Sequence, residues 1–255
     1  MTISHTKAIY IHRKQDNNTQ KCQEIGGKAT QLHNICPDLV PNWVAITADC
    51  PDDVLSEVVH KAVWSLRTYT PTEYHDKYAV RSSALAEDGE KQSYAGIFES
   101  KLNVPITGIE HAVREVRDSA ISDRVREYGD HFKDEHGNEP SNTAVIIMPM
   151  VDAKYSGVLF TKEPLGGSNK GFLEYEEGVG GVVDGTGDST YLFLDPEDFW
   201  SSEWEIMPKD MEQPVQRIWA EAKRLERNYG KPLDIEWAID KSGNAWVLQV
   251  RPITA

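Results

Sequence analysis

The sequence predicts an α+β protein with a helix-rich first half and a sheet-rich second half. Two of the three segments with apolar residues at helical spacing lie before residue 122, whereas short runs of strand type follow one another after residue 142. The 255 residues are 39% hydrophobic and 27% charged, a balance typical of a folded chain with a core of its own.

Helices are expected over residues 52–67, 107–121 and 213–229, where apolar residues recur three or four positions apart. Thr107 and Glu110 have the spacing of a capping box at the start of the second helix. The expected strands read TAVIIMPMV, YSGVLFT, GFLEY, TYLFLD, DIEWAID and AWVLQVR.

The overall charge argues against some classes of partner. Acidic residues number 41 against 27 basic ones, and the resulting net charge of −14 repels nucleic acid and anionic lipid. No apolar run approaches the ~20 residues that a membrane span needs. The three cysteines, Cys22, Cys36 and Cys50, contain no CxxC pair, which favours reduced thiols. We therefore expect a cytoplasmic protein that binds neither nucleic acid nor a membrane.

The last two strands form the sharpest local pattern. With Ser242 and Gly243 as the central turn residues, Glu236 lies directly opposite Gln249, and Arg251 shares their face. The other face then carries Ile235, Trp237, Ile239, Trp246, Leu248 and Val250. A carboxylate and an amide about 5 Å apart can hold a hard cation such as Mg²⁺, with the arginine facing a phosphate on that cation. A solvated face with a Glu–Arg salt bridge accounts for the same spacing.

Two earlier segments also suit phosphate. In Gly26-Gly27-Lys28 the glycines let backbone approach phosphate oxygens and the lysine adds a point charge, although surface turns often have this sequence. A strand-like run, YAVRSSA, places Arg81 before two serines, where an arginine is equally an ordinary salt-bridge partner.

Five segments, in this order, carry a family resemblance: GGKATQL, YAVRSSALAEDG, SYAGIFES, VIIMPMV with KYSGVLFT, and PLDIEWAID with GNAWVLQVRPIT. They resemble the N-terminal ATP-binding domain of the phosphoenolpyruvate synthase and pyruvate phosphate dikinase family. The resemblance implies a two-lobed ATP-grasp fold, with one lobe over residues 1–140 and the other over residues 141–255, and it implies ATP and Mg²⁺ as cofactors.

The resemblance also implies roles in phosphate chemistry. Lys28 and Arg81 would hold the ATP phosphates, Gly96 would offer backbone to them, and Ser100 would lie at the nucleotide. Arg251 would stabilise the transferred phosphoryl group, since phosphoryl transfer depends mainly on positioning and on neutralising charge.

The remaining implied roles concern the base and the metal. Met148 and Met150 would lie on the adenine side, and Glu236 and Gln249 would bind Mg²⁺. Met148 stands where the family commonly has glutamine, which implies the loss of one side-chain contact to adenine and weaker discrimination between bases.

Three hypotheses for function follow from the resemblance. The first is an ATP-dependent phosphotransferase that passes a phosphoryl group from Mg-ATP to a histidine on a separate domain or protein, because no histidine here has the small-residue surroundings of a phosphohistidine. In the dikinase pattern this chemistry releases AMP. The alternatives are a stand-alone ATP-grasp kinase or ligase acting on a small acceptor, and a nucleotide-binding regulatory module without turnover.

Overall fold

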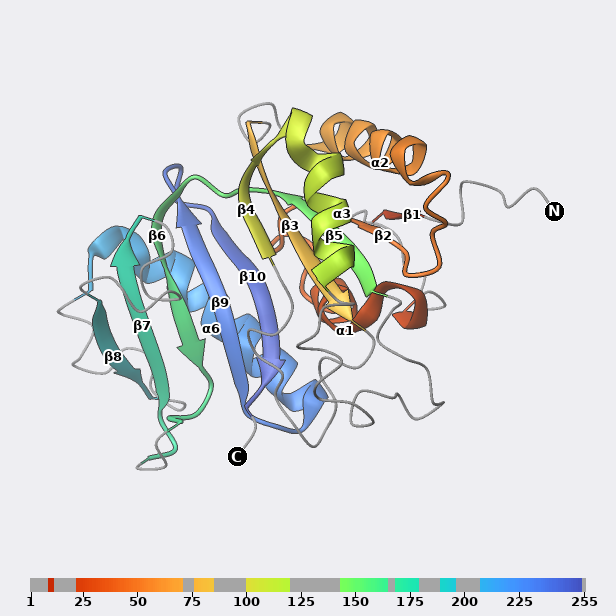
Figure 1. Ribbon diagram of the computed structural model, residues 1–255. Helices are drawn as coiled ribbons and strands as arrows, with labels where there is room; N and C mark the ends of the chain where they lie inside the picture. Colours follow the sequence, from red (N-terminus) through yellow and green to blue (C-terminus); the bar gives the residue numbers. More distant parts are fainter. Residues whose placement is uncertain are drawn as a thin grey trace. The chain divides into compact units, whose positions relative to one another are not determined.

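The computed structural model divides the chain into two compact units (Figure 1). The first comprises Met1–His33 and Asn42–Met150, and the second comprises Asn34–Pro41 and Val151–Ala255. The structure describes residues 9–11, 22–70, 76–84, 100–119, 143–164, 168–178, 189–195 and 207–253. The expected lobe boundary at residue 140 lies outside these ranges. Within them, no helix is long and apolar enough to cross a membrane.

A five-stranded antiparallel sheet forms the centre of the first unit. Its strand order is β1 (Ile9–Ile11), β2 (Val44–Ile46), β5 (Thr143–Pro149), β3 (Lys77–Ala84) and β4 (Ser100–Pro105). The predicted strand TAVIIMPMV is β5, the central one, and all seven of its residues are buried. A strand covered on both faces reads as a continuous apolar run, which explains its sequence.

Helices cover this first sheet. They are α1 (Cys22–His33), α2 (Leu55–Tyr69), the short 3₁₀ helix η4 (Ile106–Gly108) and α3 (Ile109–Ser119). The helices α2 and α3 pack on one face, where Val58, Val113 and Val145 belong to a single core cluster. The apolar spacing over residues 52–67 therefore predicted α2 and its buried stripe correctly.

The start of α3 differs from the prediction. Thr107 lies in η4, and the helix itself begins at Ile109. Glu110 instead accepts hydrogen bonds from the Ser56 hydroxyl of α2 at 3.0 Å and from Arg114 at 2.9 Å. The capping box expected from Thr107 and Glu110 is not formed, because this carboxylate ties two helices together.

The second unit has its own five-stranded antiparallel sheet, and in the described residues one helix lies across it (Figure 1). The strand order is β10 (Ala245–Pro252), β9 (Leu233–Asp240), β6 (Ala153–Phe160), β7 (Gly171–Glu177) and β8 (Thr190–Leu194). The helix is α6 (Lys209–Tyr229), and it packs so closely that a Cβ on Gly171 would lie 2.5 Å from the Trp219 ring. The five strands predicted here are confirmed.

Both units combine helices with an antiparallel sheet, so the predicted α+β class is confirmed. Each unit also contains a sheet of five strands. The predicted contrast between a helix-rich first lobe and a sheet-rich second lobe therefore stays a prediction.

Candidate functional site

The Gly26-Gly27-Lys28 segment interrupts α1. Gly26 has φ 77° and ψ 175°, outside the helical region, so the helix restarts after it. Its backbone lies against β3: a Cβ atom at residue 26 would come 1.9 Å from the Ser83 carbonyl oxygen. Both the backbone angle and the close approach require glycine at this position.

The side chain of Ser83 caps the restarted helix. Its Oγ accepts a hydrogen bond from the Ala29 N–H at 3.0 Å, and the Thr30 hydroxyl donates to the Gly26 carbonyl at 2.8 Å. A side-chain oxygen in this position satisfies one of the donors left open at a helix start. The GGK and VRSS segments thus form one structural feature, the Gly26–Ser83 corner, made by Gly26, Ala29, Thr30 and Ser83.

Two of the residues predicted to contact the nucleotide, Arg81 and Ser100, lie beside this corner. Arg81 is two residues before Ser83, so both side chains leave the same face of β3. Ser100, the first residue of β4, is the direct cross-strand partner of Arg81. The structure therefore brings Arg81 and Ser100 next to the corner that carries Lys28. Gly96 lies outside the described residues.

The predicted adenine-side residues lie at and just after the end of β5. Met148 pairs with Ala79 and shares the face of Arg81, but only 2% of it is exposed. Met150 is partly exposed, and its N–H donates to the Lys77 carbonyl at 2.9 Å. Of the two methionines, Met150 is the more accessible to a ligand.

In the second unit, the β9–β10 hairpin has the predicted pairing where it matters for a metal. Gln249 lies opposite Glu236, and Arg251 lies opposite Asp234. Paired residues point the same way, and the two pairs are two residues apart, so all four side chains share one face of the sheet. The other face of the sheet carries Ile235 and its cross-strand partner Val250. This face packs against α6.

The turn of this hairpin is one residue longer than predicted. The Asp240 N–H donates to the Asn244 carbonyl at 3.0 Å, so the loop comprises residues 241–243. Gly243, with φ 82°, takes the left-handed position that closes such three-residue loops. The pairing near the turn is therefore displaced by one residue from the expected register.

A bulge at Leu248 restores the expected register before Gln249. The predicted face of Trp246 and Leu248 is therefore wrong, because both lie before the register is restored. They pack, partly buried, against a small apolar cluster of Val151, Ala153 and Ala238.

Asp234 is a functional candidate that the sequence interpretation missed. Arg251 Nε donates to its Oδ2 at 2.6 Å, so this face carries an Asp–Arg ion pair that the sequence interpretation did not include. The other oxygen, Oδ1, is buried and has no hydrogen-bond partner among the described residues. The register proposed for Glu236 and Gln249 also places Asp234 opposite Arg251, so the signal was present.

The surroundings of Asp234 disfavour its charge. Burial raises the pKa of this carboxyl, and the negative charge of Glu236 adds to the rise, while Arg251 opposes it. A divalent cation bound beside the two carboxylates would reverse this balance, because it would stabilise the ionised form of both.

The donor set on this face fits a hard cation. Two carboxylates and one amide oxygen, from Asp234, Glu236 and Gln249, are the ligand types that Mg²⁺ takes, and the orphaned Oδ1 is a buried acceptor in need of a partner. Among the described residues no group of three His, Cys, Asp or Glu side chains forms a metal cluster. The set would thus rely on the amide and on further oxygen ligands, as Mg²⁺ sites commonly do.

Comparison with known proteins identifies a family and several relatives of this chain. A family model described as pyruvate phosphate dikinase, AMP/ATP-binding domain, matches residues 44–255. The chain is 32% identical over 207 residues to the prodigiosin synthesizing transferase PigC of Serratia marcescens, and 30% identical over 205 residues to a probable phosphoenolpyruvate synthase of Archaeoglobus fulgidus. Each alignment covers 69% of this chain but only 22% and 27% of the relative's length.

Among solved structures, the ADP complex of N5-carboxyaminoimidazole ribonucleotide synthetase aligns with a TM-score of 0.46 at 12% identity, over 92% of this chain and 46% of that one. The family match includes β3, β5 and the β9–β10 hairpin, and the GGK segment precedes it. The chain therefore belongs to the pyruvate phosphate dikinase AMP/ATP-binding domain family.

Proposed function

We propose that this chain is the ATP-binding part of an ATP-dependent phosphotransferase with an ATP-grasp fold. It takes a phosphoryl group from Mg-ATP and passes it to a histidine on a separate domain or protein. The observation that carries the proposal is the polar face of the β9–β10 hairpin, where Glu236 pairs with Gln249 and Asp234 pairs with Arg251.

In this proposal, three residues of this face bind the metal and one binds phosphate. Asp234, Glu236 and Gln249 would hold Mg²⁺ through their oxygens, and Mg²⁺ supplies charge neutralisation on the phosphates when bound. Arg251 presents a guanidinium, fixed at Nε by Asp234, whose remaining N–H groups can donate to the transferred phosphoryl group.

The Gly26–Ser83 corner supplies the second set of phosphate contacts in this proposal. Lys28 and Arg81 donate to the ATP phosphates, with Ser100 beside Arg81 and Gly96 offering backbone. Met148 and Met150 lie on the base side. Positioned charges of this kind are the main requirement of phosphoryl transfer.

The acceptor is proposed from the family membership and from the short span of the relatives that this chain covers. Incubation of the chain with Mg-ATP, with and without a phosphohistidine domain from a family member, tests it. AMP and a phosphorylated histidine only in the presence of that domain support the proposal. ADP formed with a small acid, or no turnover under either condition, contradicts it and favours a ligase or a regulatory module.

The variant Glu236→Ala should abolish turnover in this assay while the fold survives, because the side chain is only partly buried. Glu174→Ala is a matched control, since Glu174 lies in the same cross-strand row two strands away. Turnover at the wild-type rate in Glu236→Ala would remove this residue from the site.

A further inference from the structure

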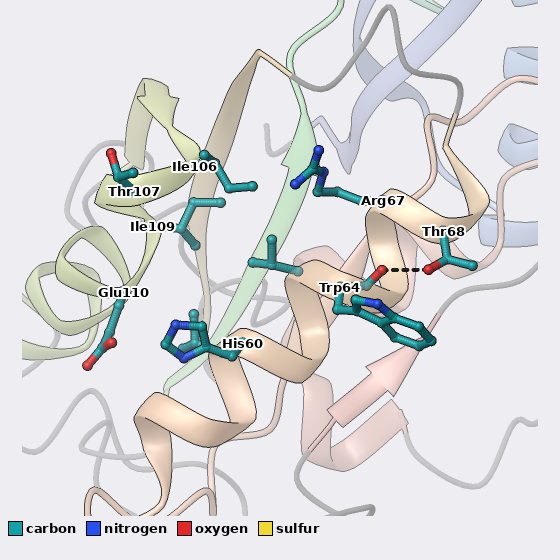
Figure 2. A pocket seen from close by; sticks show the side chains of 10 residues that line it. His60, Trp64, Arg67, Thr68, Ile106, Thr107, Ile109 and Glu110 are labelled. Carbon is teal, nitrogen blue, oxygen red and sulfur yellow. Dashed lines mark hydrogen bonds between the residues drawn. The ribbon is translucent and has the colours of Figure 1, made fainter.

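A groove of about 660 Å³ runs between α2 and the η4–α3 segment of the first unit (Figure 2). Its floor includes Val59, Val63 and Ile109, which belong to the apolar core under the two helices. Its rim exposes two large apolar side chains, Trp64 at 71% and Ile106 at 37%. This volume and this mostly apolar lining lie within the range of small-molecule sites.

The polar lining of the groove includes Arg67 and the Glu110 carboxylate, and Glu110 already accepts hydrogen bonds from Ser56 and Arg114. Figure 2 shows Arg67 reaching from α2 toward Ile106 on the opposite wall. In the described part of the chain Arg67 makes no ion pair, although every other Lys and Arg of α2, β4 and α3 does. Those pairs are Lys61–Glu57, Lys101–Glu115, Arg114–Glu110 and Arg117–Asp52. In a chain with a net charge of −14, an unpaired arginine beside apolar walls favours an anionic ligand.

A buried hydroxyl without a hydrogen-bond partner among the described residues lies in the core under the groove. Tyr78 is fully buried in the same core cluster as Val59, Val63 and Ile109, and its hydroxyl has no hydrogen-bond partner. Burial raises the pKa of Tyr78, the positive charge of Arg67 lowers it, and the negative charge of Asp76 adds to the rise. Tyr78 does not itself line the groove, so Arg67 is the group available there to an anion.

We propose that this groove binds an amphipathic anion: a small molecule with a carboxylate held by Arg67 and an apolar, preferably aromatic, body against Trp64, Ile106 and the valine floor. The site belongs to the first unit alone and does not depend on the proposed phosphotransfer. The carboxylate pairs with the Arg67 guanidinium, and the body covers the exposed apolar surface of Trp64 and Ile106.

Calorimetric titration with 1-naphthoate tests the proposal, with 1-naphthalenemethanol as the uncharged probe of similar shape. We expect one naphthoate per chain and weaker binding of the alcohol. Arg67→Gln should weaken naphthoate binding by about tenfold or more, as expected for a charge-assisted hydrogen bond in a partly dry site. Lys61→Gln, which removes a paired cation of the same helix, should leave binding unchanged. Equal binding of both probes, equal binding to Arg67→Gln, or no saturable binding at millimolar naphthoate contradicts the proposal.

Discussion

The Gly26–Ser83 corner and the β9–β10 hairpin hold their candidate residues in different ways. The corner depends on backbone: Gly26 passes so close to Ser83 that no side chain fits, and one hydroxyl caps the helix that carries Lys28. The hairpin depends on charge: a buried carboxylate fixes Arg251, and a bulge brings the pairs into register. Changes in the corner should therefore affect folding first, whereas changes in the hairpin should affect chemistry first.

The largest effect is expected from Gly26→Ala. The new Cβ would meet the Ser83 carbonyl at 1.9 Å in a backbone conformation that other residues avoid, so the free energy of unfolding should fall by about 4 kcal/mol. Urea unfolding of the purified chain measures the loss. Gly243→Ala is the matched control, because its φ is also positive but open space surrounds it, and it should cost only about 1–2 kcal/mol. Similar losses in both variants would mean that the contact with Ser83 is unimportant.

Asp234→Asn should reduce turnover and leave stability unchanged or higher, in contrast to Gly26→Ala. Turnover should fall by about 100-fold or more, since a metal ligand and the anchor of Arg251 are weakened. Stability at pH 7 should hold or rise, because burial already disfavours the ionised carboxyl. Paired assays of turnover and urea unfolding test this, with Asp210→Asn, which breaks the exposed Lys154 pair, as a control for both. A large loss of stability would show that Asp234 serves the fold instead.

The same variant changes the dependence of stability on pH. The pKa of Asp234 is raised above its ordinary value of 3.8, so the folded chain retains this proton at pH values where the unfolded chain has lost it. The contribution of this group to stability is therefore complete below pH 3.8 and is lost as the pH rises through the raised pKa. The wild-type chain should show this decline and Asp234→Asn should lack it, as measured by urea unfolding across acid pH without metal. Identical slopes would contradict the assigned shift.

The two regions also differ in how much of them the sequence predicts. Alternation along DIEWAID and AWVLQVR, counted from an assumed turn at Ser242 and Gly243, predicts that Glu236 lies opposite Gln249. The longer loop and the Leu248 bulge have no such signal, and their two displacements cancel at Gln249. The predicted pairing is thus confirmed although the predicted turn and part of the predicted face are wrong.

For the Gly26–Ser83 corner, the residue types in the sequence suggest phosphate binding, but they do not predict how the two segments contact each other. Gly26 and Ser83 are 57 positions apart in the sequence. They meet through the Ser83 carbonyl and hydroxyl groups, and such contacts produce no periodic pattern in the sequence. The strands and the α2 stripe were predictable because burial alone selects their residues. Contacts that depend on one close approach between two distant residues were not predictable from the sequence.

The variants Ser83→Ala and Ser82→Ala test the roles of two neighbouring hydroxyl groups in β3. Ser83 caps the restarted helix, so its loss should lower the free energy of unfolding by about 1–2 kcal/mol and weaken ATP binding by displacing Lys28. Ser82 is equally buried, but its hydroxyl has no hydrogen-bond partner, so Ser82→Ala should be neutral or stabilising. Unfolding curves and ATP titrations of both variants test this difference. Equal losses of stability in the two variants would show that Ser83 does not stabilise the helix by capping it.

The smallest effect is expected from Met148→Gln, which concerns the base rather than the phosphates. A site that hydrogen-bonds its ligand rejects mismatched ligands better than an apolar site, so the variant should favour ATP over GTP by a few-fold more than the wild type does. Only 2% of Met148 is exposed, so an amide there that finds no ligand would cost about 1–3 kcal/mol of stability. Titration with Mg-ATP and Mg-GTP, combined with Tm values for the free and ATP-bound chain, separates the two effects. A lower Tm that ATP does not restore, with an unchanged ratio of affinities, would place residue 148 in the core of the first unit and leave Met150 as the residue of β5's end that meets the base.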